Sequence, residues 1–404
     1  MEFKKEDRLD SDNDYLKKLS EEILLTVRRC RNCNYCFPVC PLRISTRGFQ
    51  TQSPPGILQA IYYAIRWNEF GGEEGKALSE ILYSCTTCNS CVLRCKDKST
   101  GTPLLEVIEK GRELLVEKMV GPLKDERKVM ESIKLYGNPY QRPRAERMDW
   151  LKGEFVKLLP LEKAEVLFFV GCTTSYEPEL FSVGRDLIKL WRYFGVDFGL
   201  LAEESCCADP IGRLGDKALF DGLANDNKNL FRASGVKSIV TISPHCMNTF
   251  IKEYNGLSES LSIAHYTEFL ENILKKKEPK FVKSLSYTVT YHDPCYLSKH
   301  NGITDPPRNI LKMLPGVTLK EMKDFRQNSL CCGAGGGRMY AEVEETDRLA
   351  NIRVRQALDI GAEVLATACP YCHVMLMNAV RDLGMQEKIK VKDVAELVTE
   401  ALNI

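Results

Sequence analysis

The chain has 404 residues, which is more than one hydrophobic core usually supports, so we expect two or three domains. Hydrophobic residues make up 44% of the sequence, charged residues make up 27%, and the formal net charge is +1. These values are typical of a soluble globular protein, and they argue against the strongly basic surface with which proteins bind nucleic acids.

The N-terminal residues carry charge instead of an apolar core. Because MEFKKEDRLDSDND contains acidic residues throughout, we expect neither a secretory signal nor a transit peptide. The longest wholly apolar stretches, such as Val166 to Val170, are much shorter than the roughly 20 residues that a membrane-spanning helix needs. We therefore expect a cytoplasmic protein. In that reducing compartment, the 17 cysteines are more typical of metal or cluster ligands than of disulfides.

Apolar residues at helical spacing dominate the first part of the chain. They predict helices over residues 13–28, 55–68 and 75–83 and a helical pair over 104–135. The stretch from Ile57 to Trp67 is unusually apolar, which favours core packing, with docking onto a membrane cytochrome subunit as the alternative. The segment 136–147 is rich in proline, glycine and charge, as domain boundaries often are. We therefore expect residues 1–150 to form an all-helical domain.

Two cysteine motifs follow helices in this domain. Each has the spacing C-x2-C-x2-C-x3-C, formed first by Cys30, Cys33, Cys36 and Cys40 and then by Cys85, Cys88, Cys91 and Cys95. This spacing is typical of ferredoxins with two 4Fe-4S clusters, in which the fourth cysteine of each motif ligates the other cluster. We therefore predict one cluster on Cys30, Cys33, Cys36 and Cys95, and a second on Cys85, Cys88, Cys91 and Cys40.

One departure and one alternative accompany this prediction. Lys96 stands where proline usually follows the motif, and we expect it to alter the exit turn more than the ligation. The alternative is structural zinc on paired C-x2-C knuckles in a non-enzymatic scaffold, but four cysteines in each of two motifs exceed what tetrahedral zinc uses. Two clusters in one small domain predict an electron relay.

From about residue 164 onward the pattern changes to α/β. Short apolar runs alternate with helical stretches, which predicts a largely parallel sheet; the runs are VLFFV, SIVTI, YTVTY and EVLAT. This half also repeats itself at a period of about 125 residues. The paired segments are Cys172 and Cys295, Cys206-Cys207 and Cys331-Cys332, 243–246 and 369–372, and the helical segments that start near His265 and Asp393. We predict two homologous modules, 151–280 and 281–404.

The second module has five cysteines in the pattern C-x35-CC-x36-C-x2-C, namely Cys295, Cys331, Cys332, Cys369 and Cys372. A single metal ion takes four such ligands, so a fifth indicates a larger or unusual cluster. With Gly333 after the cysteine pair, the pattern resembles the cysteine-rich CCG domain of the heterodisulfide reductase family. Joined to the double ferredoxin motif, it most resembles the cytochrome-linked catalytic subunit type. The iron-sulfur subunits of glycolate oxidase and of anaerobic glycerol-3-phosphate dehydrogenase share this layout.

The resemblance implies a function as well as a fold. In that family the five cysteines hold a non-cubane 4Fe-4S cluster that binds and splits a disulfide in one-electron steps. The implied protein is a subunit on the inner face of the cell membrane, which takes electrons from a membrane cytochrome b-type subunit and reduces a thiol disulfide; the reverse flow is equally compatible. The alternative is an electron-transfer subunit without its own substrate. It would pass electrons to quinone from a flavoprotein dehydrogenase of a 2-hydroxy acid or of glycerol-3-phosphate.

The first module departs from the five-cysteine pattern. Cys172, Cys206, Cys207 and Cys246 keep their places, but Ser243 replaces one cysteine and Ala208 replaces the glycine. Four thiolates could hold an additional cluster or none, so the sequence leaves both a degenerate, mainly structural module and an occupied one open.

Weaker signals surround these cysteines. The segment GAGGGRM, residues 333–339, is not a dinucleotide-binding loop, because Arg338 stands at the third glycine position. His292 and His373 could donate protons to a thiolate product, or they could hydrogen-bond cluster sulfurs or backbone. Lys299 and His300 are candidates for binding an anionic substrate.

Overall fold

The computed structural model describes residues 14–46, 48–95, 103–341 and 348–404. The first 13 residues and Lys96, on which two expectations depend, lie outside these ranges. The chain forms two compact units. Unit 1 comprises the described parts of Met1–Met130, Pro210–Phe220 and Gly333–Leu349, and unit 2 comprises Glu131–Asp209, Asp221–Cys332 and Ala350–Ile404. Both expected modules contribute their sheets to unit 2, and the domain boundaries at residues 150 and 280 stay predictions.

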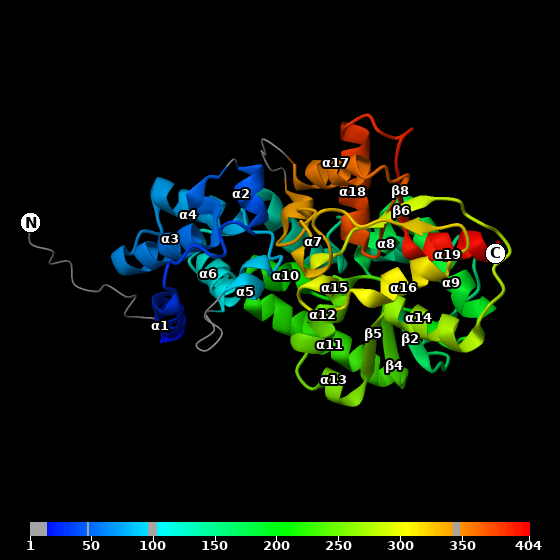
Figure 1. Ribbon diagram of the computed structural model, residues 1–404. Helices are drawn as coiled ribbons and strands as arrows, with labels where there is room; N and C mark the ends of the chain where they lie inside the picture. The colour runs from blue at the N-terminus through cyan, green and yellow to red at the C-terminus, as the bar shows by residue number, and fades with distance from the viewer. Residues whose placement is uncertain (1–13, 47, 96–102, 342–347) are drawn as a thin grey trace, which may run out of the picture. The chain divides into compact units, whose positions relative to one another are not determined.

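Unit 1 is built from helices, as the apolar spacing predicts. They are α1 (Asp14–Arg29), α2 (Pro41–Ser45), η1 (Gln50–Gln52), α3 (Pro54–Trp67), α4 (Gly72–Tyr83), α5 (Ser90–Arg94), α6 (Leu104–Glu117) and η5 (Arg338–Tyr340), with α7 (Lys124–Tyr136) crossing the unit boundary; the first of these are blue to cyan in Figure 1. Helix α3 packs against α1, α4 and α6. It buries Ile57, Ile61 and Ile65, in agreement with core packing, while Tyr63 and Trp67 stack on each other at 4.7 Å on its exposed face.

Unit 2 contains two sheets, and every strand pairing among the described residues is parallel. The first has the order β1-β3-β2-β4-β5, with β1 (Lys157–Leu159), β2 (Val166–Phe169), β3 (Phe198–Leu201), β4 (Ser238–Thr241) and β5 (Ser262–His265). The second has the order β7-β6-β8-β9, with β6 (Thr288–Tyr291), β7 (Thr318–Leu319), β8 (Val364–Thr367) and β9 (Lys390–Asp393). The four apolar runs of the sequence form the inner strands β2, β4, β6 and β8, which confirms the predicted α/β class.

Helices precede, connect and follow these strands. They are η2 (Arg144–Leu151), α8 (Cys172–Tyr176), η3 (Pro178–Leu180), α9 (Phe181–Tyr193), α12 (Pro244–Lys252), α13 (Leu257–Ser260), α14 (Tyr266–Lys277), α15 (Cys295–Ser298), α16 (Asp305–Met313), η4 (Arg326–Asn328), α18 (Pro370–Asp382) and α19 (Val394–Leu402). Three more, α10 (Asp209–Leu214), α11 (Lys217–Ser234) and α17 (Leu349–Asp359), cross the unit boundaries.

Each module ends in a helix that the sequence repeat predicts. Helices α14 and α19 begin with equivalent capping boxes, His265 with Glu268 and Asp393 with Glu396, in which side chain and backbone N–H groups pair reciprocally. Each of these helices packs on its own module and also on the other one. Helix α19 packs on α9 of the first module, and α14 packs on α16 of the second. Tyr266 Oη also donates a hydrogen bond to Asp393 Oδ1 at 2.5 Å, so the helix starts of the two modules are joined.

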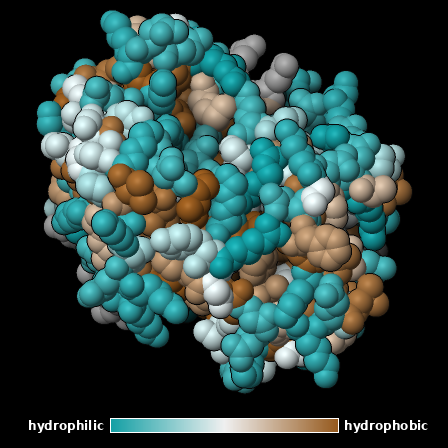
Figure 2. All heavy atoms as spheres, turned by 90° about the vertical axis from the view of Figure 1, so that its right-hand side faces the viewer, coloured by the Kyte–Doolittle hydropathy of each residue, from teal (hydrophilic) through white to brown (hydrophobic). Residues whose placement is uncertain are grey.

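Polar side chains dominate the surface drawn in Figure 2, where hydrophobic ones form separate small groups. Among the helices of the described residues, none combines the length and the apolar character that crossing a membrane requires.

Candidate metal centres

The two ferredoxin-type loops of unit 1 share an unusual backbone conformation. The residues on either side of the second cysteine of each motif are left-handed: Asn32, Asn34, Thr87 and Asn89 have φ of 50°, 60°, 50° and 66°. Asparagine tolerates this region better than most residues do. Loops with such left-handed residues form concavities lined by backbone N–H groups, which suit an anionic cluster. One such backbone group already faces a cysteine sulfur: Thr87 N donates a hydrogen bond to Cys85 Sγ at 3.4 Å.

The eight thiols of these loops fall into two groups, each drawn from both motifs. Burial raises the pKa of Cys36 to about 11, and the charges of Cys30, Cys33 and Cys95 act in the same direction. Burial also raises the pKa of Cys40, and there the neighbouring charges are those of Cys88 and Cys85. Cys91 likewise interacts with Cys85, Cys88 and Cys40, and more weakly with Cys36. The fourth cysteine of each motif therefore lies with the first three of the other motif.

This grouping fits iron-sulfur clusters. Several thiolates cannot share one buried site by themselves, because burial and mutual repulsion both raise their pKa values. A cation removes that penalty, and thiolate is the ligand that Fe-S clusters use. The ligand assignment itself stays a proposal.

In the second module, cysteines stand where inner strands end. Cys295 opens α15 shortly after β6, and Cys369 caps α18 after β8, with Cys372 in the first turn of that helix. Since β6 and β8 are paired and parallel, their carboxyl ends lie at the same sheet edge. Cys331 and Cys332 are buried on the loop that follows η4.

Cys372 contacts two other thiols of this set, and a histidine lies beside them. Cys332 Sγ lies 3.4 Å from Cys372 Sγ, and the pKa of Cys372 is raised first by burial and then by hydrogen bonds with Cys332 and Cys369. One ring nitrogen of His292 and the sulfurs of Cys332 and Cys372 lie within 4.8 Å of one another. The complete module thus gathers a buried set of soft ligands.

The orientation of His292 follows from Arg353. Arg353 Nε donates to His292 Nδ1 at 3.0 Å, and because a guanidinium only donates, Nδ1 must be the acceptor. A neutral ring then carries its proton on Nε2, which has no hydrogen-bond partner among the described residues. Burial and then the charge of Arg353 hold the pKa of His292 well below its usual value. Of the two roles that the sequence allows for His292, a neutral ring suits a hydrogen bond to a cluster sulfur better than transfer of a proton to a thiolate product.

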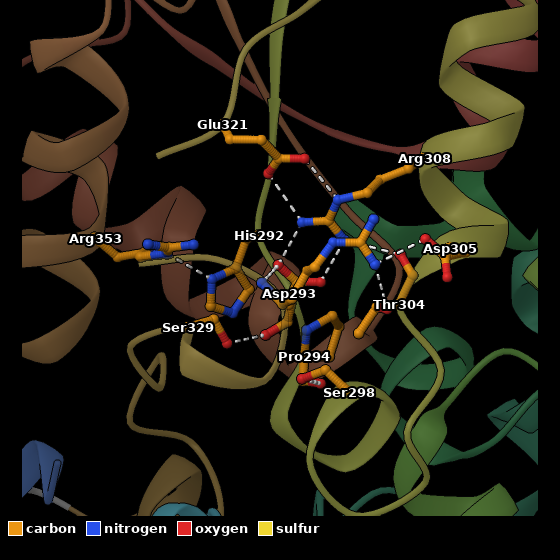
Figure 3. Close-up of polar contacts among 11 residues, drawn as sticks. His292, Asp293, Pro294, Ser298, Thr304, Asp305, Arg308, Glu321, Ser329 and Arg353 are labelled. Atoms are coloured by element: carbon orange, nitrogen blue, oxygen red, sulfur yellow. Dashed lines mark hydrogen bonds and ion pairs between the residues drawn. The ribbon is translucent and has the colours of Figure 1, made fainter. Parts of the chain in front are cut away.

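A buried ion network fixes the loop beside His292 (Figure 3). Both carboxylate oxygens of Asp293 accept from Arg308, at 2.6 and 2.8 Å, and Arg308 also binds Glu321. Asp293 Oδ2 accepts from Arg326 N at 2.7 Å, and Asp293 O accepts from Ser329 Oγ at 3.0 Å. The network therefore ties the strand end that leads to Cys295 to the loop that leads to the Cys331-Cys332 pair.

The first module also brings its four cysteines together. Hydrogen bonds link the thiols of Cys172, Cys206, Cys207 and Cys246 in that order, and all four are buried. The guanidinium of Arg147 lies at the Cys172 end of this row of thiols. Its Nη1 is 3.5 Å from Cys172 Sγ, and its Nη2 binds Glu204 at 2.6 Å. Four thiols and a compensating charge form a suitable donor set for a cluster.

The two departures of the first module have structural explanations. Ser243 Oγ accepts from His245 N at 3.3 Å and so caps α12, whereas the equivalent Cys369 makes no such cap and instead contacts Cys372. Ala208 has φ of 65°, close in sense to the 97° of Gly333, so the alanine keeps the backbone turn at the cost of a disfavoured conformation.

The remaining candidates lie near the second module's cysteines. Lys299 Nζ donates to Ser329 O at 2.5 Å, and the ring of His300 stacks on Tyr296 with 4.1 Å between centroids. Burial lowers the pKa of His373 to about 4. The sequence did not single out Arg353, Arg308 or Arg147, because nothing in their local spacing distinguishes them from surface arginines.

Comparisons with known proteins match this arrangement. A family model described as a 4Fe-4S dicluster domain matches residues 26–99, and one described as CCG, a cysteine-rich domain, matches residues 166–251 and 289–377. These matches confirm the predicted domain types and favour iron-sulfur clusters over structural zinc. A crystal structure of a hypothetical protein from Helicobacter pylori has a similar fold, with a TM-score of 0.55 and 10% identity, covering 97% of this chain and 73% of that one.

Related sequences extend over most of the chain. It is 32% identical over 414 residues to a subunit of the dihydromethanophenazine:CoB--CoM heterodisulfide reductase of Methanosarcina acetivorans, covering 96% of this chain and 97% of that one. It is 34% identical over 332 residues to probable iron-sulfur-binding oxidoreductase FadF of Bacillus subtilis, and 34% identical over 338 residues to EtfAB:quinone oxidoreductase of Syntrophomonas wolfei. These two alignments cover 80% of this chain but only 47% of each relative, so the chain spans about half their length.

Proposed function

Because the chain belongs to the family of iron-sulfur oxidoreductases that includes this heterodisulfide reductase subunit, we propose that it reduces or forms a thiol disulfide within a redox complex. Two 4Fe-4S clusters in unit 1 relay electrons to a third, non-cubane 4Fe-4S cluster in the second CCG module. The observation that supports this most directly is the buried grouping of Cys332, Cys369 and Cys372 beside His292.

The proposed ligands divide as follows. Cys30, Cys33, Cys36 and Cys95 hold one cluster of unit 1, and Cys85, Cys88, Cys91 and Cys40 hold the other. Cys295, Cys331, Cys332, Cys369 and Cys372 hold the third cluster. When bound, these groups supply electrons one at a time. A disulfide needs two electrons and two protons to give two thiols, so the site must be loaded twice for each turnover.

The chemistry of the relatives suggests the partners. Since that relative is a subunit of a heterodisulfide reductase, we propose that this chain too works in a complex. The family resemblance implies a cytochrome b-type partner subunit on the inner face of the cell membrane. The similarity to EtfAB:quinone oxidoreductase favours a second candidate, an electron-transfer subunit that passes electrons from a flavoprotein dehydrogenase to quinone without its own substrate.

Spectroscopy on anaerobically prepared protein separates the two candidates. We expect iron and sulfide for at least three 4Fe-4S clusters, or about twelve iron atoms per chain, and a paramagnetic signal that depends on added thiol or disulfide. The five-cysteine module would respond in this way only if a substrate sulfur reaches it. Full iron content without any thiol-dependent signal would contradict disulfide chemistry and leave the electron-transfer candidate.

His292 offers a sharper probe of the third site. Replacing it with leucine removes the Nε2–H donor, and hydrogen bonds to a cluster raise its reduction potential by stabilising the added negative charge. We expect the potential of the third centre to fall by about 60 mV, which is a tenfold change for a one-electron couple. A redox titration followed by paramagnetic resonance measures it.

The matched control is His300→Leu, since that ring stacks on Tyr296. We expect this control to leave the potential unchanged. Equal potentials in wild type and His292→Leu would show that His292 does not donate to the centre.

A further inference from the structure

Unit 1 includes two segments that follow the cysteine pairs of the CCG modules. Pro210–Phe220 begins three residues after Cys207, and Gly333–Leu349 begins directly after Cys332. The described residues of both segments belong to unit 1, where Arg213 O and Gly336 O each accept from the fully buried side chain of Arg112 in α6.

The guanidinium of Arg112 joins backbone from three segments. Nη2 donates to Cys85 O at 2.7 Å and to Leu82 O at 2.8 Å, next to the ferredoxin-type loop. Nη1 donates to Arg213 O at 2.8 Å and to Gly336 O at 3.0 Å. A planar fork with five donors can bind several carbonyls at once, which the single ammonium of lysine cannot reproduce. Arg112 therefore bridges the Cys85 loop and the glycine-rich segment.

The glycine-rich segment 333–339, which is not a dinucleotide-binding loop, packs closely against the Cys85 loop. A Cβ at Gly336 would lie 2.3 Å from Cys85 O, and a Cβ at Gly335 would lie 2.3 Å from Thr86 O. Gly336 also has φ of 70°. Arg338 Nη1 adds a hydrogen bond to Ser84 O at 2.8 Å. Glycine is required here because the two backbones touch.

The two thiol groups of unit 1 differ in exposure. In the first group Cys33 is exposed and Cys30 and Cys95 are half-buried, with only Cys36 buried. In the second group Cys40, Cys88 and Cys91 are buried, with only Cys85 half-buried. The first group therefore suits electron entry from a partner protein, and the second group includes Cys85, whose carbonyl Arg112 binds.

We propose that electrons leave unit 1 through the backbone contact between the Cys85 loop and Gly335–Gly336, and that Arg112 is the positioning residue that holds this contact together. The order is the cluster of Cys30, Cys33, Cys36 and Cys95, then the cluster of Cys40, Cys85, Cys88 and Cys91, then the chain from Gly336 back to Cys332. In each transfer one electron leaves a reduced centre, which becomes oxidised, and reduces the next centre by one; no bond forms or breaks. The inference rests on the proposed function, because it needs an acceptor at Cys332.

Arg112 also acts through its charge. Its guanidinium donates to Cys85 O at 2.7 Å, so a positive charge lies beside the loop that would hold the second cluster and favours the more negative, reduced state of that cluster. Lysine at position 112 would keep the positive charge but not the planar guanidinium, whereas glutamine would keep neither. The two substitutions therefore separate the effect of charge on the reduction potential of the second cluster from the effect of the hydrogen bonds on the backbone contact.

The test uses the full chain with its clusters, reduced anaerobically by dithionite and followed by rapid-freeze paramagnetic resonance. In Arg112→Lys we expect unchanged iron content and unchanged reduction of the first two clusters. Electron arrival at the third centre should be about tenfold slower, because an ammonium cannot hold all four carbonyls that the guanidinium binds and the backbone contact loosens. Arg112→Gln should in addition lower the potential of the second cluster by about 59 mV, a tenfold change in its reduction equilibrium. Gly336→Ala should slow arrival in the same way through its clash with Cys85 O.

Two controls lie in the same unit. Arg127→Lys changes an arginine that binds the carbonyls of Pro122 and Val120, and Gly71→Ala adds a Cβ with nothing within 4 Å. Both should transfer electrons at the wild-type rate. Wild-type rates in Arg112→Lys and Gly336→Ala would overturn the inference. Failure of the proposed function looks different, because the wild type itself would then show no thiol-dependent signal, whatever its rate of electron arrival.

Discussion

Replacing Cys332 with serine will remove about four iron atoms per chain, the content of one 4Fe-4S cluster, and abolish the thiol-dependent signal. Cys332 Sγ is 3.4 Å from Cys372 Sγ at the centre of the buried thiol group, and a hydroxyl is a much poorer ligand than a thiolate for iron-sulfur chemistry. Disulfide turnover should fall by at least about 100-fold, since even the outer partners of metal ligands account for 10- to 100-fold. Iron analysis, paramagnetic resonance and turnover with an artificial donor measure these losses.

The matched control is Cys207→Ser, at the equivalent place in the first module. It should keep the thiol-dependent signal and turnover, and any iron that it loses would mark a cluster in the first module. A Cys332→Ser protein that still responds to disulfide would contradict the assignment of the third site.

The second large effect concerns the crossed ligands of unit 1. The double variant Cys30→Ser/Cys95→Ser removes two thiols from one group and should cost about four iron atoms. Cys30→Ser/Cys40→Ser removes one thiol from each group and should cost about eight, with both ferredoxin signals lost. Both variants carry two cysteine-to-serine changes, and both include Cys30→Ser. They differ only in whether the second change falls in the same thiol group or in the other one.

The converse outcome would reassign the ligands. If each motif held its own cluster, Cys30→Ser/Cys40→Ser would cost about four iron atoms and Cys30→Ser/Cys95→Ser about eight. The comparison thus decides between crossed and sequential ligation by iron content alone.

The helices and strands that were predicted correctly depend on the spacing of residues close together in the sequence. The helices around the ferredoxin-type motifs and the four predicted strands β2, β4, β6 and β8 depend on patterns within a few residues, and burial on both faces gives these inner strands continuous apolar runs. The inner strand β3 and the edge strands β1, β5, β7 and β9 were not predicted, and the edge strands β5 and β9 show why. They lie at sheet edges and have the sequences SIAH and KVKD, whose exposed positions break an apolar run.

Long-range polar contacts could not be predicted in this way. Arg112 and Gly336 are 224 positions apart, and Arg353 and His292 are 61 apart, so no spacing rule connects them. The segment 210–220 and the described residues of 333–349 belong by sequence to the CCG modules but pack in unit 1. Only the three-dimensional arrangement shows that the glycines of GAGGG serve a backbone contact.

The packing of terminal helices across the two modules makes each module part of the other's folding unit. Helix α14 of the first module covers α16 of the second, with Glu271 accepting from Asn309 at 2.7 Å, and α19 packs on α9 in return. Deleting either module would therefore expose apolar surface of the other. The first module can stabilise the second in this way whether or not its own four cysteines hold a cluster.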